Sequence, residues 1–123
     1  MRKNEESRIQ QACVLWFRLQ HTSLAGLLFA IPNGGYRNAV TGAILKAEGV
    51  LAGVSDLILL YPSGKYHGLC VEMKTPKGRQ QETQKAFQRR VERVGYKYAI
   101  CRSVDEFKEV ITKYLNGEEY EED

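Results

Sequence analysis

What this 123-residue sequence lacks excludes several kinds of protein. No apolar run is long enough to cross a bilayer, and the charged start Met1–Glu6 leads into an amphipathic pattern, so we predict no membrane span and no signal peptide. The cysteines are Cys13, Cys70 and Cys101, which lie far apart in apolar runs without a CxxC or Cys/His cluster. We therefore expect reduced core thiols in an intracellular protein, and no structural zinc site.

Proline is also scarce, with 3 residues, and the chain contains neither a linker nor an internal repeat. A hydrophobic content of 43% is enough for a single core at this length. We predict one domain over residues 1–117 and a disordered acidic tail over residues 118–123. The tail holds five of the 15 acidic residues and no Lys or Arg.

Negative charge is sparse outside that tail. Residues 1–117 carry 18 basic and 10 acidic residues, a net charge of +8, although the whole chain has a net charge of only +3. A body this basic favours a polyanionic partner. A solvated surface that only keeps the protein soluble is the alternative interpretation.

Apolar periodicity predicts eight secondary-structure elements in the order α-β-α-β-β-α-β-α. The predicted helices span residues 5–20, 39–49, 80–94 and 104–115, and the predicted strands span residues 27–31, 57–61, 66–74 and 96–101. The second and third strands form a hairpin, and the long third helix returns to a parallel fourth strand. Ser103 and Glu106 predict a capping box, and Gly95 predicts a left-handed helix end. The order predicts an α/β fold with a small mixed β-sheet flanked by helices.

Two of these strands carry acidic residues that a buried strand disfavours. Asp56 opens one strand of the hairpin, and Glu72 lies inside its partner after an apolar run. Lys74 follows Glu72 by two residues, so the two side chains project from the same face. Antiparallel pairing would bring all three groups within reach of one ion. An exposed strand face with an ordinary ion pair is the alternative for Glu72 and Lys74.

These residue types suit a hard divalent cation such as Mg²⁺ or Mn²⁺, which prefers oxygen ligands. Asp56 and Glu72 would bind it, and the backbone carbonyl of Met73 would be a further ligand. A bound cation of this kind lowers the pKa of a water and offsets charge on phosphorus oxygens. Lys74 would position that water or stabilise the transition state. The arrangement predicts a metal-dependent nuclease.

Asp56 and the segment Glu72–Lys74 on a hairpin, followed by a helix, resemble the PD-(D/E)XK nuclease superfamily, whose core is restriction-endonuclease-like. More narrowly, the chain is similar to stand-alone VRR-Nuc (virus-type replication-repair nuclease) domains, from about Glu5 to about Val110. The matching segments are Pro32–Arg37, Glu48–Asp56, Glu72–Lys74 and Gln84. Ser55 stands where the family often has a proline, and it leaves an extended or turn backbone accessible before Asp56.

The resemblance implies two further catalytic residues. The family places an acid on its first helix close to the metal, and the candidates here are Glu5 and Glu6. We favour Glu6, which shares a helix face with Gln10 and would reach the metal directly or through water. Gln84 would hydrogen-bond a phosphate or a water. The family pattern alone singles out this glutamine, because others lie nearby at Gln80, Gln81 and Gln88.

Contacts to DNA are predicted from glycines and cations. Asn33 and Arg37 flank a glycine-containing segment that would place backbone N–H groups and the guanidinium against phosphate. Further candidates are Lys46, Lys77, Arg79 and Lys85, for each of which an ordinary surface charge is the alternative.

We therefore predict an endodeoxyribonuclease that depends on Mg²⁺ or Mn²⁺. The resemblance implies a homodimer that acts on branched DNA such as four-way (Holliday) junctions, encoded by a phage or mobile element and placed in the cytoplasm of a bacterial host. Trp16 and Phe17 would belong either to the core or to the dimer surface. The alternatives are a non-catalytic DNA-binding module, a flap or restriction-type nuclease, and an archaeal-type junction resolvase.

Overall fold

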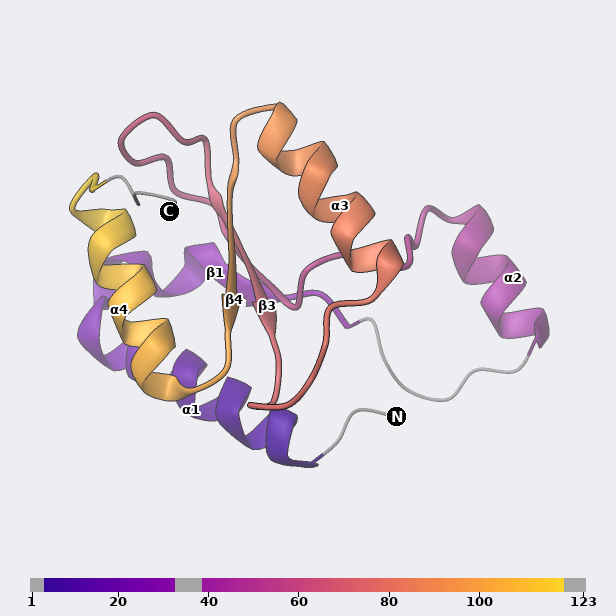
Figure 1. Cartoon of the computed structure of the whole chain (residues 1–123), viewed down its shortest axis with the longest axis horizontal. Coiled ribbons are helices and arrows are strands. Elements are labelled where there is room, and N and C mark those ends of the chain that lie inside the picture. Colours follow the sequence, from indigo (N-terminus) through magenta and orange to yellow (C-terminus); the bar gives the residue numbers. More distant parts are fainter. Residues whose placement is uncertain (1–3, 33–38, 119–123) are drawn as a thin grey trace.

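The computed structural model describes residues 4–32 and 39–118. Within them, four strands form one mixed sheet in the order β1-β2-β3-β4, which confirms the predicted α/β fold (Figure 1). The strands are β1 (Leu28–Ala30), β2 (Leu57–Leu59), β3 (Leu69–Met73) and β4 (Lys97–Cys101). The pairs β1–β2 and β2–β3 are antiparallel, and β3–β4 is parallel, as the predicted crossover requires.

Helices connect and cover these strands. They are α1 (Asn4–Gln20), α2 (Ala39–Ala47), α3 (Glu82–Arg93) and α4 (Val104–Leu115), with a 3-10 helix η1 (Thr22–Leu27) after α1. Every predicted helix and strand is present, although the strands are shorter than the apolar runs that predict them. The 3-10 helix η1 is not among the predicted elements, and the residue before its first turn makes no capping hydrogen bond through its side chain.

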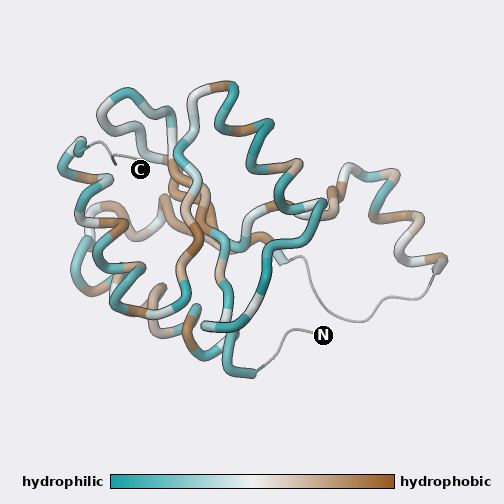
Figure 2. Tube along the Cα trace, viewed as in Figure 1, coloured by the Kyte–Doolittle hydropathy of each residue, from teal (hydrophilic) through white to brown (hydrophobic). Residues whose placement is uncertain are grey.

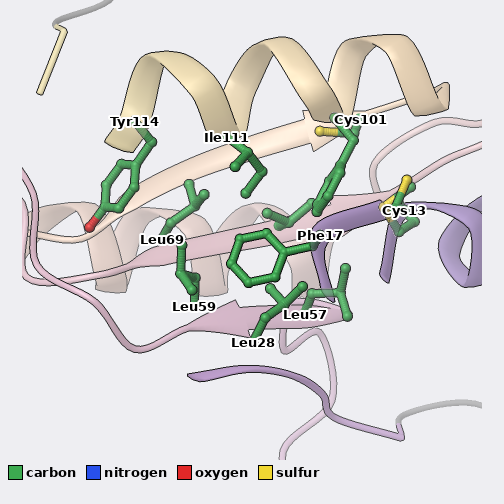
Figure 3. Packing of buried hydrophobic residues seen from close by; sticks show 12 residues of the cluster. Cys13, Phe17, Leu28, Leu57, Leu59, Leu69, Cys101, Ile111 and Tyr114 are labelled. Carbon is green, nitrogen blue, oxygen red and sulfur yellow. The ribbon is translucent and has the colours of Figure 1, made fainter. Parts of the chain in front are cut away.

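The main core lies between one face of the sheet and the helices α1 and α4 (Figure 3). Leu57, Val71 and Cys101 come from three strands and are fully buried there together with Phe17 of α1 and Phe107 of α4. In Figure 2 the hydrophobic colour is concentrated on the strands, and the helices alternate between hydrophilic and hydrophobic residues. This burial is the main source of the fold's stability, at roughly 25 cal/mol per Å² of apolar surface removed from water.

Aromatic residues of α1 belong to this core. Phe17 has no exposed surface, and Trp16 packs edge-on against Phe107 with ring centroids 6.1 Å apart. Of the two alternatives for these residues, the structure therefore supports core packing.

The opposite face of the sheet carries polar residues and packs against α3. Because neighbouring strand residues alternate between faces, burial of Val71 and Met73 in the main core turns Glu72 and Lys74 to the α3 side. Tyr98 of β4 also lies on this side, where its ring contacts Phe87 of α3 at a centroid distance of 6.3 Å.

Two helix ends follow the sequence signals. Ser103 Oγ accepts from the backbone N–H of Glu106, as a capping box requires, while the Glu106 carboxylate accepts from the N–H of Arg102, one residue before the cap. Gly95 ends α3 at a φ of 96°, in the left-handed region. At the far end of the chain, the N–H of Glu118 donates to the carbonyl of Lys113. Residues 119–123 of the predicted tail lie outside the described residues.

None of the helices in the described residues has the length and apolar character of a membrane span. Cys13, Cys70 and Cys101 are all buried and unpaired, as predicted. The helix α2 stands to one side of the sheet, beyond α3 (Figure 1), and its Val40 and Ile44 are exposed.

Candidate active site

Asp56 and Glu72 lie opposite each other at one end of the β2–β3 pair. The register pairs Leu57 with Val71, and one further antiparallel step places Asp56 across from Glu72. Directly opposed residues have Cβ atoms about 4.5–5.5 Å apart. The hairpin thus brings together the two acids that the sequence analysis singles out.

A backbone hydrogen bond fixes the first of these carboxylates. Oδ2 of Asp56 accepts from the N–H of Met73 at 2.6 Å. This hydrogen bond ties Asp56 to β3 at Met73, the residue between Glu72 and Lys74. Short bonds of this kind are typical of ionised acceptors.

The carboxylate of Glu72 is buried, with 1% of the residue exposed, and its two oxygens have different surroundings. Oε1 accepts from the hydroxyl of Tyr98 at 2.5 Å and from Nε2 of Gln80 at 3.0 Å. Oε2 has no hydrogen-bond partner within the described chain, and the ammonium of Lys74 lies 3.6 Å from it. Lys74 is itself only 8% exposed. An unbonded oxygen on a buried carboxylate is costly unless a cation or water completes it.

The loop before Asp56 is held against the start of α3. Gly53 has a φ of 90°, and a Cβ at this position would lie 2.3 Å from the carbonyl oxygen of Thr83. Only glycine therefore fits this contact. Ser55, at the position of the family's proline, is buried and donates through its hydroxyl to the carbonyl of Leu57. These contacts determine how the chain enters the site.

The loop that leaves the site is held by Arg102. Its Nη1 donates to the carbonyls of Thr75 at 2.8 Å and Gly78 at 2.6 Å. This loop runs from Lys74 to Gln80 and so connects two residues that contact Glu72. The end of β4 thereby holds the loop that follows β3.

The donor set fits a hard divalent cation. Two carboxylates, one with an oxygen that lacks a partner, supply the oxygen ligands that Mg²⁺ and Mn²⁺ prefer. Mg²⁺ is usually bound by one or two carboxylates and keeps several waters, so no larger cage of side chains is needed.

The acids on α1 do not add a third carboxylate to this pair. Within residues 4–32 and 39–118, no three His, Cys, Asp or Glu side chains gather closely enough to hold a metal ion. Glu6 is half-buried and Glu5 is exposed. A role for Glu6 through an intervening water stays a prediction.

Gln84 lies in the first turn of α3, where its Oε1 accepts from the N–H of Gln81 at 2.7 Å. In this structure its carbonyl oxygen therefore caps the helix. The glutamine that contacts Glu72 is Gln80, four residues earlier. The catalytic role predicted for Gln84 stays a prediction.

Sequence reasoning missed Gln80 and Tyr98 as parts of the site. A signal for Tyr98 existed, because the crossover through α3 predicts that β4 lies beside β3. The register that pairs Cys70 with Tyr98, and so places the hydroxyl near Glu72, was not available from the sequence. Gln80 offered no signal that distinguished it from its neighbouring glutamines.

Four of the six predicted DNA contacts lie within the described residues. Asn33 and Arg37 lie outside the described residues. Lys77 and Arg79 are exposed on the loop between β3 and α3. Lys85 is exposed on α3 and lies 3.4 Å from Glu82, and Lys46 lines a groove between the α2 region and α3.

An α/β sheet with two opposed acids and a lysine at one end is the arrangement expected of a nuclease of the PD-(D/E)XK type. The chain belongs to the VRR-NUC family, whose domain matches residues 2–105. It is also similar to a solved structure described as a VRR_NUC domain protein, with a TM-score of 0.81 and 24% identity, over 98% of this chain and 96% of the other. No curated protein gives a significant match.

The family assignment confirms the resemblance seen in the sequence, and the structural similarity confirms the fold. Membership of the family implies a nuclease that hydrolyses phosphodiester bonds, with DNA as its partner and a divalent metal as its cofactor.

Proposed function

We propose that this protein is a Mg²⁺- or Mn²⁺-dependent endodeoxyribonuclease that cleaves branched DNA such as four-way junctions. The observation that carries the catalytic part is the opposed pair Asp56 and Glu72, with Lys74 beside the oxygen of Glu72 that lacks a hydrogen-bond partner. An isolated surface ion pair would not be buried or leave a carboxylate oxygen unbonded.

Asp56 and Glu72 would hold the metal, and the Met73 carbonyl would be a third ligand. The N–H of Met73 points towards Asp56. Because the N–H and carbonyl of a strand residue face the same neighbouring strand, the Met73 carbonyl lies on the same side as Asp56, which supports this role. When bound, a divalent metal makes a water more acidic and offsets charge on the phosphate oxygens.

Lys74 acts on the attacking water or on the phosphate. Its ammonium is a donor only, with three N–H bonds, and Glu72 keeps it at the site. It can therefore orient a water lone pair towards phosphorus or donate to a phosphate oxygen as negative charge develops there. Gln84 and Glu6 would assist through a phosphate or a water.

The DNA would lie across the loop after β3 and along α3. Lys77 and Arg79 are exposed on that loop, and Lys85, Arg89 and Arg93 follow at intervals of four residues along an exposed face of α3. Four residues advance a helix by about 6 Å, so the three side chains form one row of positive charge that starts at the site. Such a row suits a phosphate backbone.

A homodimer is proposed because two sites related by a two-fold axis would cut two strands of a symmetric junction. Since Phe17 is in the core, the exposed apolar residues Val40 and Ile44 of α2, with Val50 and Leu51 after it, are the better candidate surface. Sedimentation equilibrium of the wild type and Ile44→Lys tests this. Leu19→Lys, at an exposed apolar residue of α1, is the matched control.

Cleavage of a labelled panel tests the proposed activity. The panel contains a four-way junction, a 5′ flap, a single strand and a linear duplex, each with Mg²⁺, Mn²⁺ or EDTA. We expect metal-dependent cutting of the branched substrates, which Lys74→Ala abolishes and Lys113→Ala, on α4, leaves unchanged. Binding of these substrates without cutting in either metal would show a DNA-binding module instead.

A further inference from the structure

Two residues outside the family motif donate to one oxygen of Glu72. The hydroxyl of Tyr98 lies 2.5 Å from Oε1, and Nε2 of Gln80 lies 3.0 Å from the same atom. They come from β4 and from the end of the loop after β3, so separate parts of the chain converge on this oxygen. No comparable donor reaches Oε2 within the described residues.

The amide of Gln80 has its orientation set by two acceptors. Its Nε2 also donates to Oε1 of Gln88 at 2.8 Å, so the two N–H bonds of the amide match two acceptor oxygens. A flipped amide would place its own carbonyl oxygen against both acceptors. The flipped arrangement is therefore repulsive, and the donor faces Glu72.

Tyr98 is a constant donor. The residue is 5% exposed, and its ring packs against Phe87 of α3. The phenol is the donor in the hydrogen bond, and Oε1 of Glu72 is the acceptor.

We infer that Gln80 and Tyr98 are positioning residues for Glu72, which hold Oε1 so that Oε2 is presented to the divalent metal. This inference rests on the proposed function. A carboxylate fixed in this way does not have to rotate or exchange partners when the metal binds. It also offers one oxygen, next to Lys74. Loss of a hydrogen bond behind a metal ligand typically weakens metal binding by about 10–100-fold.

The experiment measures binding of Mn²⁺ to the full chain without DNA, by isothermal titration calorimetry and by the electron paramagnetic resonance signal of unbound Mn²⁺. Tyr98→Phe removes only the hydroxyl, and Gln80→Met removes the amide at similar length. We expect Mn²⁺ affinity to fall by about 10–100-fold in each variant. Thermal unfolding in EDTA reports separately whether each variant is folded.

Tyr114→Phe is the matched control. Tyr114 is also buried, and its hydroxyl donates to the carbonyl of Tyr61 at 2.7 Å, on the α4 side of the sheet. The same substitution there also removes one hydrogen bond from a buried tyrosine, but far from Glu72 in the fold. We expect its Mn²⁺ affinity to equal that of the wild type.

The outcomes separate this inference from the proposed function. Wild-type Mn²⁺ affinity in folded Tyr98→Phe and Gln80→Met would overturn the inference and leave the nuclease intact. An equal loss in Tyr114→Phe would also overturn it, because the effect would then be one of general stability. A wild type that binds no Mn²⁺ would overturn both. If Tyr98→Phe does not fold, Gln80→Met decides, since Gln80 is only half-buried.

Discussion

The backbone N–H of Met73 donates to Oδ2 of Asp56 at 2.6 Å. At the site, the two strands of the hairpin are therefore joined through a side chain and not through a backbone–backbone hydrogen bond. An asparagine could accept the same bond through its amide oxygen without carrying charge. This relationship separates the structural role of Asp56 from its chemical one.

We therefore expect Asp56→Asn to keep the fold and lose the activity. Loss of a residue behind a metal ligand typically costs up to about 100-fold. Asp56 is itself a proposed ligand, so cleavage should fall by more than about 100-fold. Thermal stability in EDTA should not decrease, because the variant also relieves repulsion between two opposed carboxylates. Cleavage assays and thermal unfolding in EDTA check both points. Wild-type cleavage by the variant would remove Asp56 from the catalytic set.

Gly53→Ala should destabilise the fold and impair cleavage. The new Cβ would lie 2.3 Å from the carbonyl oxygen of Thr83, at a φ of 90° that other residues rarely adopt. We expect a loss of more than about 1 kcal/mol in the free energy of unfolding. Urea denaturation measures this. Gly42→Ala is the control. A Cβ added at Gly42 would meet no atom within 4 Å apart from its chain neighbours and the backbone of its own helix. Gly42 also lies inside α2, where alanine stabilises a helix by up to about 1 kcal/mol.

Neutralising the row on α3 should weaken DNA binding in a salt-dependent way. For Arg89→Gln/Arg93→Gln, the slope of log K against log salt should become shallower by up to about 1.8, or about 0.9 for each lost phosphate contact. Fluorescence anisotropy in EDTA, at several salt concentrations, measures this without cleavage. Arg18→Gln/Lys113→Gln makes the same change of charge on α1 and α4. An equal change in the slope for this control would contradict the proposed path of DNA along α3.

Stability should fall as the pH rises above about 9. Burial raises the pKa of Cys13 and of Cys101 from an ordinary value of 9.0 to about 12. Above the lower value the unfolded chain loses these protons and the folded chain keeps them, so deprotonation favours unfolding. Urea midpoints at pH 7.5 and pH 10 check this. The decrease in the urea midpoint between these two pH values should be smaller in Cys13→Ala/Cys101→Ala. An unchanged decrease would show that other groups cause it.

The architecture can be predicted from the sequence because it depends on local patterns, such as apolar runs and helix-ending glycines. The apolar run before Glu72 must be buried, and the glycine at position 95 ends α3 where the chain returns to β4. The approach of Asp56 to Glu72 is also predictable, because both acids lie at the same end of a predicted hairpin whose buried face sets the register. The 3-10 helix η1 is not, because it depends on contacts with α1 rather than on a capping signal.

The surroundings of Glu72 could not be derived in the same way. Gln80 and Gln84 are chemically identical, and only the path of the loop after Lys74 decides that the first contacts Glu72 and the second caps α3. Arg102, more than twenty residues later, holds that loop. A contact set by distant parts of the chain leaves no local pattern to detect.

The position of Arg102 has a consequence during synthesis of the protein. Tyr98 belongs to the last strand and Arg102 follows it directly. A nascent chain that has not yet released this strand from the ribosome therefore lacks one of the two donors to Glu72 and the hydrogen bonds that hold the loop. The two acids and Lys74 are then already made, but the hydrogen bonds from Tyr98 to Glu72 and from Arg102 to the loop are missing. The hydrogen-bond set around Glu72 is therefore completed only after β4 has been made.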